Sequence, residues 1–418
     1  RDEESMKAVV FTLGCKVNSC ESSSLMNGLT EMGYEVSSEL CPADLYIVNT
    51  CAVTAEAEKK SRQAIARARK FNPDCEIIVT GCASQKSPED FLKKNNVTLV
   101  TGAQSKDKIL SMIGKKGAII DSEGDYYEEF LPAKTDGVRA YVKVQDGCDN
   151  FCSYCIIPYL RGRNRSRKAD NVIREIAYLS PKEAVITGIN LSSYDKKGKG
   201  LTGLIEALSA VDCRIRLGSL EVNVINEEFL GALKNLNDFA PHFHLSLQSG
   251  SDAVLKTMNR HYTTEQFLEK CGLIRKFFPD AGITTDIIVG YSTETEEDFS
   301  NTLETAEKAG FSDIHCFPYS KREGTVGAKL KELPYSVKEE RMHRLLALKS
   351  EMKDRFIGRL IGKTEEFLPE EREGEYFVGY TGNYVRCYVK NAEIGKMISV
   401  KITERYLDGA KAVPAAEE

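Results

Sequence analysis

The fold is constrained most strongly by a long alternation of strand-like and helix-like segments in the sequence. In the N-terminal part, buried strands are expected at Lys7–Thr12, Leu45–Asn49 and Glu76–Thr80, with helices at Ser23–Met32 and Thr54–Lys70. Strands that alternate with helices predict a parallel sheet with helices packed on its faces. We therefore predict an α/β domain over residues 1–125. The acidic, pattern-poor stretch that follows it predicts a linker at 126–138.

A second alternation of the same kind begins at Ala140. Six strands are expected, at Ala140–Val144, Glu183–Thr187, Arg214–Leu217, Phe243–Leu247, Ile283–Val289 and Asp313–Phe317. Helical patterns lie between them, near Ala169–Leu179, Leu201–Ala210, Glu227–Leu236, Thr264–Phe277 and Thr295–Ala309, and a long charged helix is expected at Ser336–Ile361. Six strand–helix units predict a partial (β/α) barrel over residues 139–358, two units short of a full barrel.

The C-terminal part changes character. Its short strands are expected at Tyr376–Tyr380, Tyr384–Val389 and Met397–Thr403, and Gly and Asn turns separate them. This pattern predicts a small antiparallel β-barrel over residues 359–411. Residues 412–418 are expected to form a disordered tail.

The composition narrows the class of protein. No apolar run approaches the roughly 18 residues that span a bilayer, and Arg1–Lys7 lacks the apolar core of a signal peptide, so we expect a cytoplasmic protein without a membrane partner. The 13 cysteines are an odd number in a long chain, which disfavours a disulfide framework and favours metal binding or catalysis. The net charge of −5 gives no global basic field, although a local patch can still contact phosphates. No hydrolase triad or phosphate-binding loop is present, so hydrolysis and phosphoryl transfer are disfavoured.

The strongest chemical signal is Cys148-Asp-Asn-Phe-Cys152-Ser-Tyr-Cys155, directly after the first barrel strand. We call these three residues the barrel cysteines. They can hold three irons of a 4Fe-4S cube, whose usual ligation is four cysteines. The fourth iron then stays open for a non-protein ligand, and the mouth of a barrel is where active sites lie. The alternative is a structural zinc loop, but structural zinc sites usually combine two separated ligand pairs and are closed by a fourth ligand.

Three further cysteines each follow a strand of the N-terminal sheet. We call them the sheet cysteines: Cys15, Cys51 and Cys82. They lie just beyond the carboxyl ends of the three expected strands. Ligand sites of open α/β sheets form on that edge, so the three thiols can converge on a metal centre. The alternative is that they are small buried apolar residues, since free Cys is among the most buried residue types.

Several motifs together resemble those of the radical S-adenosylmethionine (SAM) methylthiotransferase family. They are Thr12-Leu-Gly-Cys15-Lys-Val-Asn18, Asn49-Thr-Cys51-Ala-Val53, Gly81-Cys82-Ala-Ser-Gln85, Gly147-Cys148-Asp-Asn-Phe-Cys152-Ser-Tyr-Cys155-Ile-Ile-Pro158, Arg161-Gly-Arg163-Asn-Arg165-Ser-Arg167 and Leu247-Gln-Ser-Gly-Ser251. The resemblance extends from about Lys7 to about Asp408.

The resemblance implies an α/β protein with a flavodoxin-like N-terminal domain, a partial (β/α)6 radical-SAM barrel and a small C-terminal antiparallel β-barrel, a TRAM domain that binds RNA. It also implies two 4Fe-4S clusters and SAM as cofactors. The barrel cysteines would hold the cluster that binds and cleaves SAM to a 5′-deoxyadenosyl radical. The sheet cysteines would hold an auxiliary cluster where sulfur is delivered, and a second SAM would supply the methyl group.

The resemblance also suggests residues that contact SAM. These are Gly188, Asn190, Glu221, Ser246, Gln248 and Ser249, which all follow barrel strands. Family members usually have Phe-Pro-Gly where this chain has Tyr291-Ser292-Thr293, and Pro is common at Val222. These departures put the local shape of the SAM pocket in doubt more than the chemistry.

Basic and aromatic residues are candidates for RNA contacts. They are Lys16, Arg161, Arg163, Arg165, Arg167, Tyr384 and Arg386. Clustered arginines suit phosphate contacts, and a basic helical face that contains Lys59 and Arg62 is a further candidate. A solvated charged face is the alternative for these groups.

The residues after Cys15 indicate the substrate. Lys16-Val17 resembles the branch that acts on N6-threonylcarbamoyladenosine in tRNA, whereas Gln-Met is usual for N6-isopentenyladenosine and Ala-Lys or Pro-Lys for a ribosomal-protein aspartate. Lys16, Arg161 or Arg163 could pair with the threonyl carboxylate; otherwise Lys16 is a solvated loop residue. A metal-stabilised RNA-binding protein is the non-enzyme alternative. The expected partners are tRNA, an electron donor such as flavodoxin or ferredoxin, and a sulfur source, with no stable protein partner.

Overall fold

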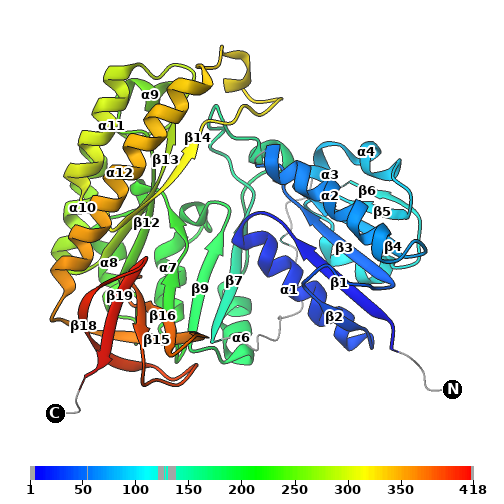
Figure 1. The fold of residues 1–418 in the computed structure, drawn as a ribbon, viewed down its shortest axis with the longest axis horizontal. Helices are drawn as coiled ribbons and strands as arrows, with labels where there is room; N and C mark the ends of the chain where they lie inside the picture. The colour runs from blue at the N-terminus through cyan, green and yellow to red at the C-terminus, as the bar shows by residue number, and fades with distance from the viewer. Residues whose placement is uncertain (1–4, 54, 121–126, 128, 130–137, 416–418) are drawn as a thin grey trace.

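The structure is a computed structural model, and it describes residues 5–53, 55–120, 127, 129 and 138–415. Figure 1 shows an N-terminal sheet beside a larger α/β unit, with a small all-β unit packed against one end of that larger unit. None of the described helices is both long and apolar enough to cross a membrane.

The N-terminal sheet has six strands in the order β2-β1-β3-β4-β5-β6, and all their pairings are parallel. The strands are β1 (Lys7–Thr12), β2 (Glu35–Ser37), β3 (Leu45–Thr50), β4 (Glu76–Gly81), β5 (Val97–Thr101) and β6 (Gly117–Ile119). The helices are α1 (Lys16–Glu31), α2 (Ala55–Phe71), α3 (Cys82–Lys86), α4 (Pro88–Leu92) and the 3-10 turns η1 (Lys106–Lys108) and η2 (Leu110–Met112). The strand order reverses at β1, as in flavodoxin-like folds, so that expectation is confirmed.

The apolar runs of these strands are explained by burial on both faces of the sheet. Val9, Tyr46 and Val48 belong to the core under one face, whereas Val10 and Ile47 belong to the core under the other. Strands covered by helices on both faces read as continuous apolar runs. Helix α1, however, begins at Lys16, immediately after Cys15, and not at Ser23 as expected. The sequence pattern missed its first turns because their buried residues include the polar Asn18, Glu21 and Ser22.

The larger unit contains the six expected barrel strands. They are β7 (Arg139–Asp146), β9 (Glu183–Gly188), β10 (Arg214–Leu217), β12 (His242–Gln248), β13 (Gly282–Val289) and β14 (Asp313–Pro318), together with the two-residue strands β8 (Arg165–Ser166) and β11 (Ser219–Leu220). They pair as β10-β9-β7-β8 and β11-β12-β13-β14. The chain joins the two sheets because β11 begins two residues after β10 ends. The partial barrel is therefore confirmed.

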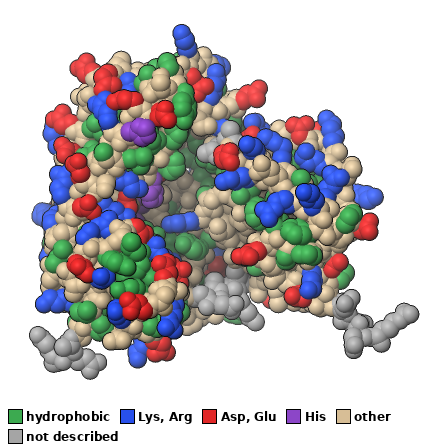
Figure 2. Space-filling model, viewed as in Figure 1, with side chains coloured by type: hydrophobic (Ala, Val, Ile, Leu, Met, Phe, Trp, Pro, Cys, Tyr) green, Lys and Arg blue, Asp and Glu red, His purple; other side chains and the backbone are tan. Residues whose placement is uncertain are grey.

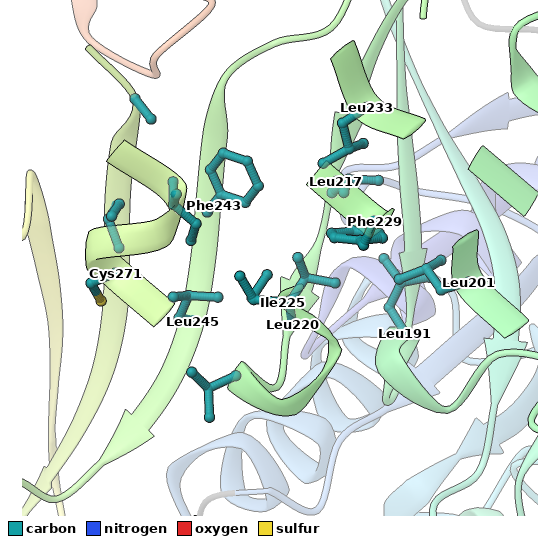
Figure 3. Close-up of a cluster of buried hydrophobic side chains, with 14 of the residues drawn as sticks. Leu191, Leu201, Leu217, Leu220, Ile225, Phe229, Leu233, Phe243, Leu245 and Cys271 are labelled. Carbon is teal, nitrogen blue, oxygen red and sulfur yellow. The ribbon is translucent and has the colours of Figure 1, made fainter. Parts of the chain in front are cut away.

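Helices cover the outside of this barrel. They are α5 (Ile157–Arg161), α6 (Ala169–Leu179), α7 (Gly200–Leu208), α8 (Glu227–Lys234), α9 (Asp252–Thr257), α10 (Thr264–Phe277), α11 (Glu296–Ala309) and α12 (Tyr335–Leu360), with the 3-10 turns η3 (Leu191–Ser193), η4 (Val222–Val224) and η5 (Gly327–Lys329). Alternate strand residues pack against them. Phe243 and Leu245 of β12, for example, join Leu217, Leu220 and Phe229 in the largest core cluster (Figure 3).

The opposite side chains of the same strands make a polar interior. Lys143, Glu183, Arg216 and His244 are all at least nine-tenths buried, yet they lie outside the apolar core. Figure 2 shows a hollow between the barrel and the N-terminal sheet, with histidine side chains and basic side chains (Lys or Arg) on its wall. The interior of this barrel is thus lined by charged and polar side chains, which can contact a polar ligand.

The C-terminal strands close into a barrel in the order β15-β16-β17-β19-β18. They are β15 (Thr364–Glu373), β16 (Tyr376–Thr381), β17 (Arg386–Val389), β18 (Ile398–Tyr406) and β19 (Gly409–Pro414). All pairings are antiparallel except β17 with β19. The small barrel is confirmed, although the sequence pattern predicted neither β15 nor β19.

The expected tail at 412–418 is wrong for its first residues. Strand β19 includes Ala412, which is buried in the small core, and the Ala415 N–H donates to the Ser399 carbonyl at 2.9 Å. Residues 416–418 lie outside the described residues, as does most of the expected linker at 126–138. Within that stretch the Tyr127 hydroxyl donates to the Lys143 carbonyl at 2.8 Å.

Candidate functional site

The sheet cysteines lie at one edge of the N-terminal sheet. Cys15 is the N-cap of α1, Cys51 directly follows β3, and Cys82 is the first residue of α3. Positions at the start of helices favour negative charge, and hence a thiolate.

Asn18 holds two of the cysteine loops together. Its amide donates to the Leu13 carbonyl at 2.7 Å and to the Thr50 carbonyl at 3.1 Å. Gly14, with φ of +107°, packs so tightly that a Cβ there would lie 2.9 Å from the Cys51 Sγ. The Cys15 and Cys51 loops are therefore in contact, which explains why Gly14 and Asn18 flank the first cysteine.

The pKa values of these thiols reflect the same closeness. Burial, and then the nearby Cys82 and Cys15, raise the pKa of Cys51 to about 11. Burial also raises the pKa of Cys82, while Arg161 and Lys106 oppose the rise. Three close thiols disfavour one another's thiolates, whereas a bound cationic metal reverses that preference.

The barrel cysteines lie in the loop between β7 and α5. Gly147 has φ of +71°, and a Cβ there would lie 1.9 Å from the Arg163 carbonyl oxygen, so only glycine fits this turn. Two donors point at the sulfurs: the Asn190 amide is 3.6 Å from the Cys148 Sγ, and the Arg260 Nη1 is 3.3 Å from the Cys152 Sγ. Burial, and then the neighbouring thiols, raise the pKa of Cys155 to about 12.

Both triplets fit an iron–sulfur cluster better than a single ion. Among the described residues, the group that brings three metal-ligating atoms within 4.8 Å of one another is His244, Asp286 and His315, which could hold a divalent cation. A 4Fe-4S cube places its thiolates on different irons, so its ligands are spread more widely than those of one ion. Donors to the sulfurs are also the expected surroundings of such a cluster.

The two triplets are neighbours across the boundary between the sheet and the barrel. Ile156 and Leu160, which follow Cys155, are buried in the same apolar cluster as Cys82. The Arg322 guanidinium, from the loop after β14, donates to the Ala52 carbonyl next to Cys51 at 3.3 Å. A substrate in the hollow could thus lie close to both triplets.

A cavity of about 290 Å³ adjoins the barrel-cysteine loop. Glu221, an expected SAM contact, lines it, and its carboxylate accepts from the Asn150 amide at 2.5 Å and pairs with Arg260 at 3.1 Å. Asn190 is held beside the loop because its backbone N–H donates to Gln145 at 2.7 Å.

The other expected SAM contacts differ in their surroundings. Gly188 pairs with Gln145 at the end of β9. The Ser246 carbonyl accepts from the Tyr262 hydroxyl at 2.8 Å, and Gln248 has a left-handed φ of +67° at the end of β12. Ser249 is fully buried and its hydroxyl lies 3.3 Å from that of Thr302, so its role as a SAM contact stays a prediction.

The departure at Tyr291 has a structural role. Its ring is fully buried, and its hydroxyl lies 2.7 Å from the Ser153 hydroxyl, inside the barrel-cysteine loop. Tyr291 therefore supports this loop from below.

Three of the four motif arginines are not available to RNA, which corrects the expectation for them. Arg161 is fully buried, and its guanidinium bonds Glu21 at 2.9 Å and Asp146 at 3.0 Å. Arg165 donates to the Arg161 carbonyl at 2.8 Å, and Arg167 pairs with Glu129 at 2.7 Å. These side chains join elements of the fold because buried cations need partners.

The remaining expected RNA residues are more accessible. The Arg163 side chain is 69% exposed and lies over the Phe151 ring at 4.7 Å. Arg386 is bound by Glu371, Glu373 and Asp408, so most of its charge is neutralised. Tyr384 stacks on His242 at 4.4 Å, and Lys16 is exposed, with its ammonium 5.8 Å from the centroid of the Tyr141 ring.

Sequence reasoning missed Glu21, Asn150, Arg260 and Tyr262. Each contacts a residue of one of the two sites but lies outside the cysteine motifs. Asn150 could have been identified from the sequence, since it lies between two of the barrel cysteines. The others pair with residues distant in sequence, and no local pattern reveals such pairs.

Comparisons with known proteins agree with this arrangement. Residues 7–102 match the model of the uncharacterized protein family UPF0004, and residues 142–306 match the radical SAM superfamily. The chain is 39% identical to a threonylcarbamoyladenosine tRNA methylthiotransferase of Bacillus subtilis, over 95% of this chain and 94% of that one. It is also 39% identical to a protein of the same name from Thermotoga maritima, over 94% and 93%.

More distant likenesses were also found. A tRNA-2-methylthio-N(6)-dimethylallyladenosine synthase of Acetivibrio thermocellus is 36% identical, over 94% of this chain and 87% of that one. Among solved structures, a radical S-adenosylmethionine methyltransferase from Kitasatospora setae covers 77% of each chain with a TM-score of 0.56 and 14% identity. That likeness concerns the fold alone.

Proposed function

The chain belongs to the methylthiotransferase family of radical SAM enzymes, and from this premise we propose that it converts N6-threonylcarbamoyladenosine in tRNA to the 2-methylthio derivative. The observation that carries the proposal is the close approach of two cysteine triplets beside one polar hollow, in a chain similar over nearly its whole length to enzymes of that name. The residues after Cys15, Lys16-Val17, support the same branch.

In this proposal the barrel cysteines and the sheet cysteines each hold a 4Fe-4S cluster. When bound, these clusters and SAM supply radical hydrogen abstraction, sulfur and a methyl group. Asn190 and Arg260 orient and stabilise the thiolates of Cys148 and Cys152 by donating to their sulfurs. Arg161 and Lys106 do the same electrostatically for Cys82.

The residues beside the barrel-cysteine loop suit a zwitterionic ligand. Glu221 and Arg260 place one carboxylate and one guanidinium at the same cavity wall. We assign the SAM site to this wall, with Gly188, Asn190, Ser246 and Gln248 as further candidate contacts.

RNA is proposed to approach over the mouth of the hollow. Arg163 is exposed beside the barrel cysteines, and α2 presents exposed Lys59, Lys60 and Arg62. Such cations suit phosphate contacts. The further partners are an electron donor such as flavodoxin or ferredoxin and a sulfur source, and a tRNA substrate places the reaction in the cytoplasm.

The test uses the iron-loaded protein with two anticodon stem-loops, one with N6-threonylcarbamoyladenosine and one with N6-isopentenyladenosine. Mass spectrometry of the nucleosides should show 2-methylthio product from the first RNA. Product from the isopentenyl RNA alone, or methylthiolation of a ribosomal protein instead of RNA, would contradict the substrate assignment. Absence of iron and of SAM cleavage after anaerobic reconstitution would instead support an RNA-binding protein.

A further inference from the structure

Lys16 is a cation without an anionic partner in a crowded positive environment. It begins α1, and its ammonium lies 5.8 Å from the centroid of the Tyr141 ring on β7. Among the described residues, no carboxylate pairs with it. The Lys16 side chain is exposed to solvent, and Arg139 and Arg216 are its charged neighbours. Such a lysine is stabilised by any anion that enters the hollow.

The nearest carboxylate in the barrel is already shared. Glu183 on β9 pairs with Arg139 at 2.6 Å, with Arg216 at 2.8 Å and with Arg214 at 3.0 Å. One carboxylate thus faces three guanidinium groups. Glu370 adds a second carboxylate to Arg139, at 2.7 Å. Asp238 is a further acidic neighbour of Arg214. Each of these arginines thus has an acidic partner or neighbour, whereas Lys16 has no paired carboxylate among the described residues.

Asp286 is a further acid inside the barrel. It lies on β13 and bonds His244 at 3.2 Å and His315 at 3.1 Å, and these rings occupy both carboxylate oxygens. Asp286 is therefore engaged with the two histidines and not with Lys16, Arg139 or Arg216.

The C-terminal barrel closes the floor of the hollow. The Arg216 guanidinium donates to the Thr381 and Gly382 carbonyls at 3.0 and 2.9 Å, and it lies 4.9 Å from the Tyr384 ring. Tyr384 in turn stacks on His242. A ligand group that reaches these residues meets the Arg216 guanidinium beside the Tyr384 ring.

The position suits the far end of a modified base. Tyr141 precedes Cys148 by seven residues, roughly 20 Å along a strand at about 3.3 Å per residue. This leaves space between the barrel cysteines and Lys16 for SAM and the adenine. A substituent on N6 would extend from the base away from the barrel cysteines, toward Lys16.

We propose that Lys16, together with Arg139 and Arg216, forms the subsite that binds the carboxylate of the N6-threonylcarbamoyl group. This inference rests on the proposed function and adds the residues that select its substrate. The isopentenyl group has no carboxylate, so it would leave Lys16 without an anionic partner. The subsite therefore discriminates by attraction to one substituent and by the cost of burying the other.

The test compares two stem-loops that differ only in this charge. One contains N6-threonylcarbamoyladenosine, and the other contains its threoninamide analogue, in which the carboxylate is a neutral amide. Binding is measured by fluorescence anisotropy with the iron-loaded protein, without reductant, so that no turnover occurs. The wild type should bind the carboxylate RNA about 10- to 100-fold more tightly, the range of a charge-assisted contact in a partly buried site.

Lys16→Met should lose most of this preference, whereas Lys16→Arg should retain it. The matched control is Lys276→Met, which removes the same charge from a 72% exposed lysine on the outer helix α10 and should leave the ratio unchanged. A misfolded variant would lose affinity for both RNAs, so the ratio separates folding from recognition. If the Lys16→Met ratio equals the wild-type ratio while wild-type enzyme makes the threonylcarbamoyl product, the subsite is wrong and the proposed function stands. Methylthiolation of the isopentenyl RNA alone would instead overturn the function itself.

Discussion

Replacing Glu21 by Gln should destabilise the joint between the N-terminal sheet and the barrel. Glu21 on α1 is fully buried, and its carboxylate bonds Arg161 at 2.9 Å, Lys143 at 2.7 Å and Lys106. Lys106 belongs to the N-terminal unit, whereas Lys143 and Arg161 belong to the barrel. Gln keeps the shape of the side chain but removes the charge that these three cations share.

The expected loss is about 3 kcal/mol, at the lower end of the about 3–5 kcal/mol measured when one partner of a buried ion pair is removed. The lower end applies because the amide oxygen still accepts a hydrogen bond. Glu35→Gln is the matched control, since the Lys7–Glu35 pair is more than half exposed at 3.5 Å. Exposed pairs contribute about 0–1 kcal/mol, so this variant should resemble the wild type.

The assay is urea unfolding of the iron-free protein, followed by circular dichroism because the chain has no Trp. The iron-free form keeps the clusters from contributing to stability. The first unfolding transition of Glu21→Gln should move to lower urea, while that of Glu35→Gln should not. Equal midpoints for both variants and the wild type would refute the role given to Glu21.

The same carboxylate predicts the response to acid. Burial alone would raise the pKa of Glu21, but Arg161, Lys106 and Lys143 outweigh burial and hold that pKa well below its ordinary value. Because the folded pKa lies below the unfolded value of about 4.3, the stabilisation is complete above that pH and is lost as the pH falls toward the folded pKa. The wild type should therefore lose unfolding free energy below about pH 4 more steeply than Glu21→Gln. Parallel pH profiles would contradict this assignment.

Three further changes separate the parts of the site. Replacing any one barrel cysteine by Ala should abolish SAM cleavage, because all three thiolates hold the cluster; continued formation of 5′-deoxyadenosine would argue against this. Replacing all three sheet cysteines by Ala should remove about half of the iron and stop sulfur transfer but not SAM cleavage, so full iron content would disprove their convergence. Tyr291→Phe removes the hydroxyl bonded to Ser153, worth about 1 kcal/mol, and should speed iron release to a chelator; an unchanged release rate would remove Tyr291 as a support of the loop.

The helices and strands were predictable where the hydrophobic periodicity of a segment agrees with the turn residues that bound it. The six barrel strands are short apolar runs between helical patterns, and the structure contains all of them. Strand β15 was missed because Glu and Pro dominate its sequence, and β19 because Gly, Ala and Lys do. Both are held by pairing with distant strands in a closed barrel, which local propensity does not register.

The arginine motif shows where sequence reasoning fails for the site. Four arginines at alternate positions from Arg161 to Arg167 have the pattern of a solvent-exposed basic stripe, and only Arg163 is one. The partners that bury Arg161, namely Glu21 and Asp146, lie 140 and 15 residues away in sequence. Whether a charge run meets solvent or carboxylates depends on that long-range pairing, which a single sequence does not reveal.

Several cationic side chains are buried in the interior of this chain. The chain is acidic overall, with a net charge of −5, yet Lys106, Lys143, Arg161, Arg214 and Arg216 are all at least nine-tenths buried. Two of them, Arg161 and Lys106, oppose the rise that burial causes in the pKa of the Cys82 thiol, and Arg216 is a charged neighbour of Lys16. Thiolate clusters, the carboxylate of SAM and a threonyl carboxylate are all anionic, so an interior with excess positive charge favours each of them in a low-dielectric site. The acidic exterior then confines RNA attraction to the few exposed cations near the mouth, Arg163 among them. In the function that we propose, this arrangement would steer one nucleotide toward the cysteine triplets without binding the rest of the RNA tightly.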